Sequence, residues 1–287
     1  MEAVLYQTEP GVKVLVHAQR PVSTPRGSVV LVHGLEGSSE AGYARSMAWA
    51  LLESGFAVHR FNMRSCGGTD NLAPTAYHAG QTSDLLAVLR ELRGQSAAPL
   101  FLVGYSLGGN VALKLAGETA EEAARLLAGV CSVSAPIDLS ACAHALGRPG
   151  NFIYQRRFLK ALLARVCRRH IQDPEMYTLE HLPKVKSIVD FDDYYTARLF
   201  GFGTAANYFR TQSAAQFLSR IRIPTLAVCA QDDPLVPFEA YRDPSLWENP
   251  HLKLVAPEKG GHLGFLARSG PRFWLDPTIL EWIEALV

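Results

Sequence analysis

The sequence has little that would direct it to a membrane or to nucleic acid. No apolar run approaches the roughly 18 residues that a membrane-spanning helix needs, and residues 1–20 lack a basic stretch followed by a long apolar one. A formal net charge of +1 gives the chain no overall attraction to nucleic acid or to anionic membranes. We therefore expect a protein without an integral membrane segment, not exported, and not bound to nucleic acid.

Cysteine is scarce and scattered, and common cofactor motifs are missing. The five cysteines are odd in number and never spaced C-x-x-C, which argues against a disulfide framework and a zinc knuckle. The nine histidines include no H-E-x-x-H, and there is neither a G-x-x-x-x-G-K-[ST] phosphate loop nor a G-x-G-x-x-G after the first predicted strand of the parallel sheet. We expect a cytoplasmic location, no metal and no cofactor.

The sequence does contain a regular alternation of short apolar runs with longer helical patterns. Parallel strands need helical crossovers and are buried on both faces, so the alternation predicts an α/β fold, a mostly parallel central sheet with helices on both faces. Two earlier runs separated by Pro10-Gly11 predict an antiparallel hairpin at the sheet edge. Parallel strands are expected at 28–34, 56–63, 100–106, 129–136, 225–231 and 252–257, the hairpin at 3–8 and 12–18, and helices near 40–54, 78–93, 107–117 and 277–286.

This alternation stops between residues 138 and 220, where the sequence is helical and rich in arginine and aromatic residues. We expect a helical cap at 138–220, inserted into a core made of 1–137 and 221–287. From Arg148 to Lys186, nine lysines and arginines stand against three acidic residues, and we expect these cations to face outward. Nine aromatic residues could line an acyl pocket or form the cap's own core: Phe152, Tyr154, Phe158, Phe191, Tyr194, Tyr195, Phe200, Phe202 and Tyr208.

The stretch "GYSLG" (104–108) matches G-x-S-x-G between a predicted strand and a predicted helix. In that context the pattern predicts a nucleophile elbow, with the hydroxyl of Ser106 projecting beyond the carboxyl edge of the sheet. The alternative is a small residue in a glycine-rich turn. The nucleophile interpretation requires a base, an acid and an oxyanion hole elsewhere in the chain.

Candidates for the base and the acid follow the last two predicted strands. His262 lies in "EKGGHLGFL" (258–266), and "CAQDDPLVP" (229–237) offers Asp232 and Asp233. The order serine, aspartate, histidine is the one expected for an α/β-hydrolase. We favour Asp233 as the acid because it aligns with the pattern G-x-x-D-x-x-x-P, and Asp232 would then bond nearby backbone.

The oxyanion hole is expected from two backbone N–H groups, those of Leu107 and of Leu35 in "LVHGLEGSS" (31–39). His33 in that loop could be a second base, but we interpret it as a structural residue that orders the hole. Cys66 in "FNMRSCGGTDN" (61–71) could be reactive, but no base is close to it in the sequence, and we interpret it as a small turn residue.

Several motifs together resemble the YheT-like branch of the α/β-hydrolase superfamily, carboxylesterases that act on acyl esters. These motifs are "HGLEGSS", "MRSCGGTDN", "YHAGQTSDL", "GYSLGGN", "VSAPIDLSAC", "FDDYYTARLFGF", "AQDDPLVP" and "GGHLGF", and the resemblance runs from about Val29 to the C-terminus. It implies a triad of Ser106, His262 and an aspartate of the 232–233 pair. Members of the branch usually carry a longer N-terminal extension, and some carry a membrane anchor, so membrane attachment is not inferred from the resemblance.

We therefore expect serine-dependent hydrolysis of small-molecule or lipid-like acyl esters, with short-to-medium acyl chains, through an acyl-enzyme. Two alternatives use the same triad, an acyltransferase and a phospholipid-type acyl hydrolase. A third is a hydrolase fold that only binds ligand. The sequence does not determine the physiological substrate or the oligomeric state.

Overall fold

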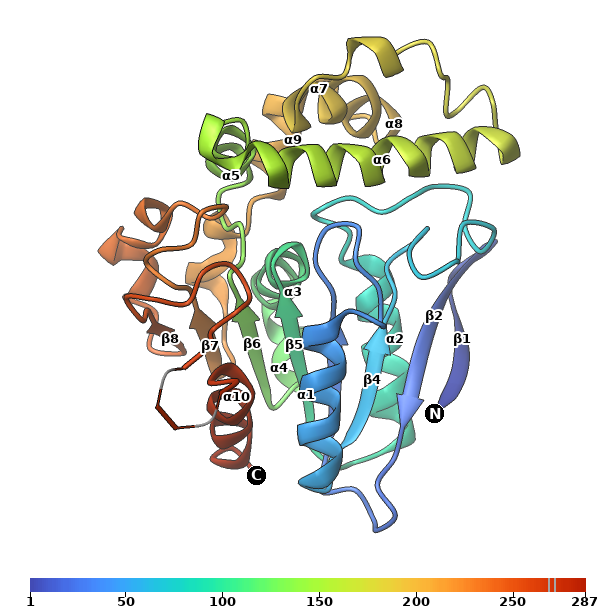
Figure 1. Ribbon diagram of the computed structural model, residues 1–287. Coiled ribbons are helices and arrows are strands. Elements are labelled where there is room, and N and C mark those ends of the chain that lie inside the picture. The colour runs from blue at the N-terminus through green and yellow to red at the C-terminus, as the bar shows by residue number, and fades with distance from the viewer. Residues whose placement is uncertain (268, 271) are drawn as a thin grey trace.

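The computed structural model describes residues 1–267, 269–270 and 272–287, and its centre is a twisted eight-stranded sheet (Figure 1). The strand order is β1-β2-β4-β3-β5-β6-β7-β8. Strands β3 to β8 run parallel, and β1 and β2 form an antiparallel hairpin that pairs with β4. The predicted α/β fold and edge hairpin are thus confirmed. The strands span Glu2–Glu9, Val12–Gln19, Ser28–Val32, Ala57–Phe61, Leu100–Tyr105, Gly129–Val133, Thr225–Val228 and Leu252–Val255.

Strand β5 lies at the centre of the sheet and is buried along its whole length. Its side chains alternate between the two faces, as the period of two requires. Leu100 and Leu102 join the core beneath one set of helices, whereas Phe101 and Val103 join the core beneath the other set. Burial on both faces explains why the strand is an unbroken apolar run in the sequence.

Helices α1 (Gly42–Glu53) and α10 (Leu275–Glu284) cover one face of the sheet, and α2 (Ser83–Gln95), α3 (Leu107–Glu118) and α4 (Ala120–Leu126) cover the other (Figure 1). The short α4 was not predicted. Helix α2 begins five residues later than predicted, since the backbone at Ala79 bonds to the Tyr208 hydroxyl and Gly80 packs tightly against Gln212. The segment before α2 is therefore held as a loop.

Helices of the predicted cap lie across the carboxyl ends of the strands, with the long α6 spanning the molecule (Figure 1). They are α5 (Leu139–Leu146), α6 (Phe152–Gln172), α7 (Ile188–Phe191), α8 (Ala197–Leu199) and α9 (Ala205–Gln212), with a π-helical turn at Asp192–Thr196. The last stretch, Ala214–Arg220, is a 3₁₀ helix that packs along α3. The domain boundaries stay a prediction.

The prediction that the cap cations face outward is wrong for Arg165 and Arg169. Both are buried on the inner side of α6. Arg169 donates to the backbone carbonyls of Asp70, Ala73 and Pro74. These bonds join the cap to the loop after β4, and they explain how a guanidinium is tolerated in the interior.

Candidate active site

The backbone at Ser106, between β5 and α3, has the strained conformation of a nucleophile elbow. Its φ of 52° and ψ of −121° lie in a region that residues with a Cβ rarely adopt. A Cβ at Gly104 would lie 2.2 Å from the Gly108 carbonyl oxygen, and one at Gly108 would lie 2.5 Å from the oxygens of Val32 and His33. The glycines around the serine are therefore required by close approach of the backbone.

Three predicted site residues, from three different loops, lie in one hydrogen-bonded chain. His262 Nε2 lies 2.8 Å from Ser106 Oγ. On the other side of the ring, Nδ1 lies 2.9 Å and 3.1 Å from the two carboxylate oxygens of Asp233. An imidazole that donates from Nδ1 to a carboxylate presents Nε2 as the acceptor, which is the tautomer that can accept the proton of the Ser106 hydroxyl.

The two adjacent aspartates point to different partners. Asp233 is buried, and besides His262 it accepts hydrogen bonds from the N–H groups of Leu235 at 2.9 Å and Val236 at 3.1 Å. Asp232 accepts from the N–H groups of Gly260 and Gly261, both at 2.8 Å. These bonds lower the pKa of Asp232. Asp232 thus fixes the loop that carries His262, while Asp233 contacts the imidazole.

A further hydroxyl, on Ser134 just after β6, holds the same loop and was not singled out in the sequence. It donates to the backbone carbonyl of His262, and its own φ of 48° is positive. Its position one residue beyond a parallel strand was the signal that could have identified it, because carboxyl ends of adjacent strands meet at this edge of the sheet.

The predicted oxyanion donors lie beside Ser106. Leu35 and Leu107 both line the pocket that contains the serine, and a Cβ at Gly34 would lie only 3.0 Å from the serine Cβ. Among the described residues neither Leu35 N–H nor Leu107 N–H has a hydrogen-bond acceptor. Two unpaired amides at a cavity wall are what an oxyanion hole requires before substrate binds.

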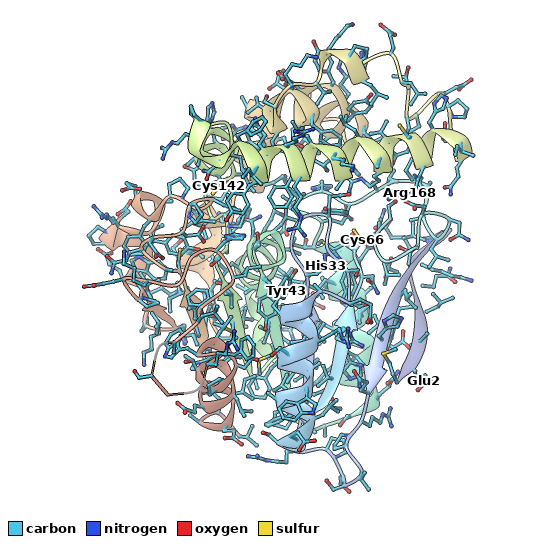
Figure 2. The ribbon with its side chains drawn as sticks, viewed as in Figure 1. Glu2, His33, Tyr43, Cys66, Cys142 and Arg168 are labelled. Atoms are coloured by element: carbon cyan, nitrogen blue, oxygen red, sulfur yellow. The ribbon has the colours of Figure 1, made fainter. Side chains whose placement is uncertain are left out.

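His33 holds the loop that carries Leu35 in place through hydrogen bonds of both its ring nitrogens. Its Nδ1 lies 2.8 Å from the Gly34 carbonyl, and its Nε2 accepts from Met63 N–H at 3.2 Å. Burial lowers the pKa of His33 to about 4, so the ring is neutral at pH 7. Figure 2 shows His33 and Tyr43 at the carboxyl edge of the sheet, below α6, and Tyr43 accepts from Gly34 N–H at 2.9 Å.

A buried ion pair, which sequence analysis missed, links the cap to the same loop. Arg165 of α6 donates to Glu36 at 2.6 Å, and both side chains are almost fully buried. The Tyr77 hydroxyl donates to the Glu36 carboxylate and accepts from Glu36 N–H. Glu36 directly follows Leu35 and has a positive φ of 53°. No local pattern reveals a contact between residues 129 positions apart.

Two hollows meet at Ser106. One is an apolar pocket beneath the cap. Its volume, measured as the space open to the centre of a water-sized sphere, is about 90 Å³. The other is a larger groove, about 730 Å³ by the same measure, between α6 and the loop after β8. Ser106, His262 and Leu35 line both. Three of the nine cap aromatics line the apolar pocket: Phe158, Phe191 and Tyr208.

Cys66 is fully buried, and burial raises the pKa of its thiol, which disfavours the reactive thiolate. Within the described ranges, no group of three or more His, Cys, Asp or Glu side chains could hold a metal ion. None of the described helices is both long enough and apolar enough to cross a membrane.

The chain belongs to the α/β-hydrolase fold family, whose model matches residues 27–269. Among solved structures, the Pyrococcus furiosus esterase Pf2001 superposes with a TM-score of 0.65 at 17% identity, covering 99% of this chain and 90% of that one. At that identity the likeness shows the fold alone. It agrees with the sheet order and the elbow described above.

Curated relatives narrow the family to the branch that the motifs resemble. "Putative esterase YheT" of Escherichia coli (strain K12) is 35% identical over 89% of this chain and 76% of its own length. "Phospholipase ABHD3" of Mus musculus is 30% identical over 92% of this chain and 65% of its own length. The resemblance to the YheT-like branch is confirmed, and the chain is an ester-hydrolysing enzyme of this family.

Proposed function

We propose that the protein hydrolyses carboxylic acyl esters through an acyl-enzyme on Ser106. The observation that carries the proposal is the hydrogen-bonded chain from Ser106 through His262 to Asp233. Ser106 Oγ attacks the ester carbonyl carbon while His262 Nε2 takes the hydroxyl proton, and the same nitrogen returns it to the departing alcohol. Water then repeats the sequence on the acyl-enzyme and releases the acid. Asp233 orients the ring and stabilises its protonated form.

The negative charge of each tetrahedral intermediate is held by the N–H groups of Leu35 and Leu107. Support comes from their place beside Ser106 and from their unpaired state in the described structure. Donors fixed in advance need no reorganisation when charge develops, and one such donor contributes roughly 10²–10³ in kcat in other serine hydrolases.

The apolar pocket beneath the cap is proposed to hold the acyl chain. Its lining is mainly apolar, from α5, α6, α7 and the Ser106 elbow. This pocket is much smaller than the groove, and each CH₂ of an acyl chain buried in it contributes about 0.8 kcal/mol. The proposed preference is therefore for short-to-medium chains.

The alcohol portion of the ester is proposed to leave through the groove, which Ser106 also lines. Because this groove could admit an alcohol as readily as water, acyl transfer to an alcohol is the second candidate function. A phospholipid-type acyl hydrolase would place its headgroup in the same groove. The location predicted from the sequence, the cytoplasm, stays a prediction.

The nucleophile is tested by covalent labelling. Purified protein should take up one fluorophosphonate, and mass spectrometry should locate it on Ser106. The Ser106→Ala variant should remain unlabelled and fold with an unchanged melting temperature. Equal labelling of the two proteins would show that another residue is the nucleophile.

The acyl pocket is tested with p-nitrophenyl esters of increasing chain length. We expect kcat/KM to rise from acetyl to medium chains and to fall for long ones. Replacing Ala143, which lines the pocket from α5, with Phe should move the optimum to shorter chains. Ala141→Phe on the same helix, outside the pocket lining, is the control. An optimum that stays in place in Ala143→Phe would contradict this assignment.

A further inference from the structure

Helix α6 has an outer face of unusual composition. The 21-residue helix, about 30 Å long, contains six arginines and lysines and no acidic residue. A solvent-facing helix normally mixes both signs of charge with few apolar side chains. Here large apolar side chains are also exposed: Phe152 by 58%, Ile153 by 77% and, at the far end, Ile171 by 83%.

The six cations divide into two groups by their partners. Arg165, Arg168 and Arg169 are bonded to groups of the core: Glu36, Asp70 and nearby carbonyls. Arg156, Arg157 and Lys160 are exposed, and within the described part of the chain none of them has an ion pair.

The three unpaired cations lie in the first half of α6, next to Phe152 and Ile153. The positive end of the helix dipole is at this end, so the position is unfavourable for cations in the free protein. An anionic partner would relieve the electrostatic repulsion among these three cations.

The groove that leads to Ser106 begins at the same place. Tyr154 and Arg157 form one side of it, and Leu266 and Phe273 form the other. These two residues of the loop after β8 are 59% and 55% exposed. Of the two acids of the groove, Glu36 is charge-paired with Arg165, whereas Asp276 accepts a hydrogen bond from the neutral Ser46 hydroxyl.

We propose that this surface, made of Phe152, Ile153, Tyr154, Leu266 and Phe273 with Arg156, Arg157 and Lys160, docks on an anionic phospholipid membrane. Apolar side chains gain by entering the boundary between headgroups and acyl chains, and cations gain from anionic headgroups. Nucleic acid would pair with the cations but would not bury the aromatic and aliphatic side chains. An apolar protein surface would bury those side chains but would leave the cations unpaired. A membrane provides both partners in one plane.

Docking in this orientation turns the mouth of the groove toward the lipid. An acyl ester dissolved in the membrane would then reach Ser106 without crossing bulk water. This consequence for the substrate rests on the proposed function, whereas the docking itself does not.

The experiment measures vesicle binding of the full chain carrying Ser106→Ala, so that binding is independent of catalysis. Co-sedimentation is compared between vesicles of phosphatidylcholine alone and vesicles that also contain phosphatidylglycerol. We expect binding to the mixed vesicles that weakens as salt is raised. Arg156→Gln with Lys160→Gln should weaken it about 30-fold, at roughly one kcal/mol per charge, and Ile153→Ser should weaken it about tenfold or more.

Matched controls remove equally exposed groups elsewhere. Lys13→Gln with Arg125→Gln removes two exposed cations from β2 and α4, and Val22→Ser removes an exposed apolar side chain. These variants should bind like the parent. Absence of binding, equal binding to both vesicle types, or equal losses in controls and test variants would overturn the proposal. Self-association that Ile153→Ser abolishes, without vesicle binding, would overturn it in favour of contact between two copies.

Discussion

Asp192 carries the most informative titration in the molecule, because a carboxyl group in an apolar pocket should make stability depend on pH. It lies in the π-helical turn after α7 and lines the apolar pocket. Burial raises the pKa of Asp192 from 3.8 to about 7, although Thr196 donates to it at 2.6 Å and the charge of Arg165 opposes the rise. The neighbouring Asp193 adds to the rise.

The direction of the pH dependence follows from whether the folded or the unfolded chain holds the proton of Asp192 at a given pH. Below about pH 4 the carboxyl is protonated in both folded and unfolded chains. Between about pH 4 and pH 7 the unfolded chain loses a proton that the folded chain keeps, so the free energy of unfolding falls as the pH rises. Above about pH 7 both forms are ionised and the loss is complete. A rise of about three pKa units corresponds to at most about 4 kcal/mol.

Asp192 retains some accessible surface and lines the pocket, so solvent screening reduces the expected loss in the free energy of unfolding to about 1–3 kcal/mol. The test is Asp192→Asn, which is neutral at every pH and keeps an oxygen for the Thr196 hydroxyl. Urea unfolding followed by circular dichroism at pH 4 to 8 should show the variant gaining stability over the parent as pH rises. The exposed Glu175→Gln is the control for loss of a charge. A difference that stays constant from pH 4 to 8 would show that burial does not raise the pKa of Asp192 in this way.

Three further substitutions test the supports of the site. Arg165→Met leaves the Glu36 carboxylate buried without its cation, and urea unfolding should show a loss of about 3–5 kcal/mol that adding Glu36→Gln largely restores. Gly108→Ala forces a Cβ against the end of β3 and the loop after it. The free energy of unfolding should therefore fall by about 1–3 kcal/mol, measured as a lower melting temperature, and kcat should fall as well. Asp233→Asn should lower kcat on the order of 10⁴-fold, while Asp232→Asn should cost about 1 kcal/mol of stability and little kcat; the opposite ranking in kcat would exchange their roles.

Elements with a strong local signal could be predicted from the sequence. Strand β5 is an unbroken apolar run, and Pro10-Gly11 marks the turn of the edge hairpin, so both were predicted close to their observed bounds. The start of α2 was predicted too early. The helical pattern there continues back to about residue 78, but bonds from Tyr208 and packing of Gln212, both on α9, hold that stretch as a loop. Contacts from distant residues override local propensity in this segment.

The candidate site divides in the same way. Ser106, Asp233 and His262 each follow a strand of a parallel sheet, so strand order alone brings them to one edge. The hydrogen bond of Ser134 and the ion pair of Glu36 depend on how two loops approach each other. Their residue types are common in turns, and nothing in the local pattern separates a bonded serine from a solvated one.

Arg165 shows why the cap is the least predictable part and why it bears on specificity. In the sequence it is one of nine cations in a basic segment, and its outward-facing neighbours give no hint that it points inward. In the structure it reaches the residue next to Leu35 and also lines the pocket beside Asp192. The elbow, the imidazole and the backbone amides are fixed by the core, whereas the pocket walls and their buried charges come largely from the cap. Changes in the cap should therefore alter which esters are accepted more readily than they alter the chemistry at Ser106.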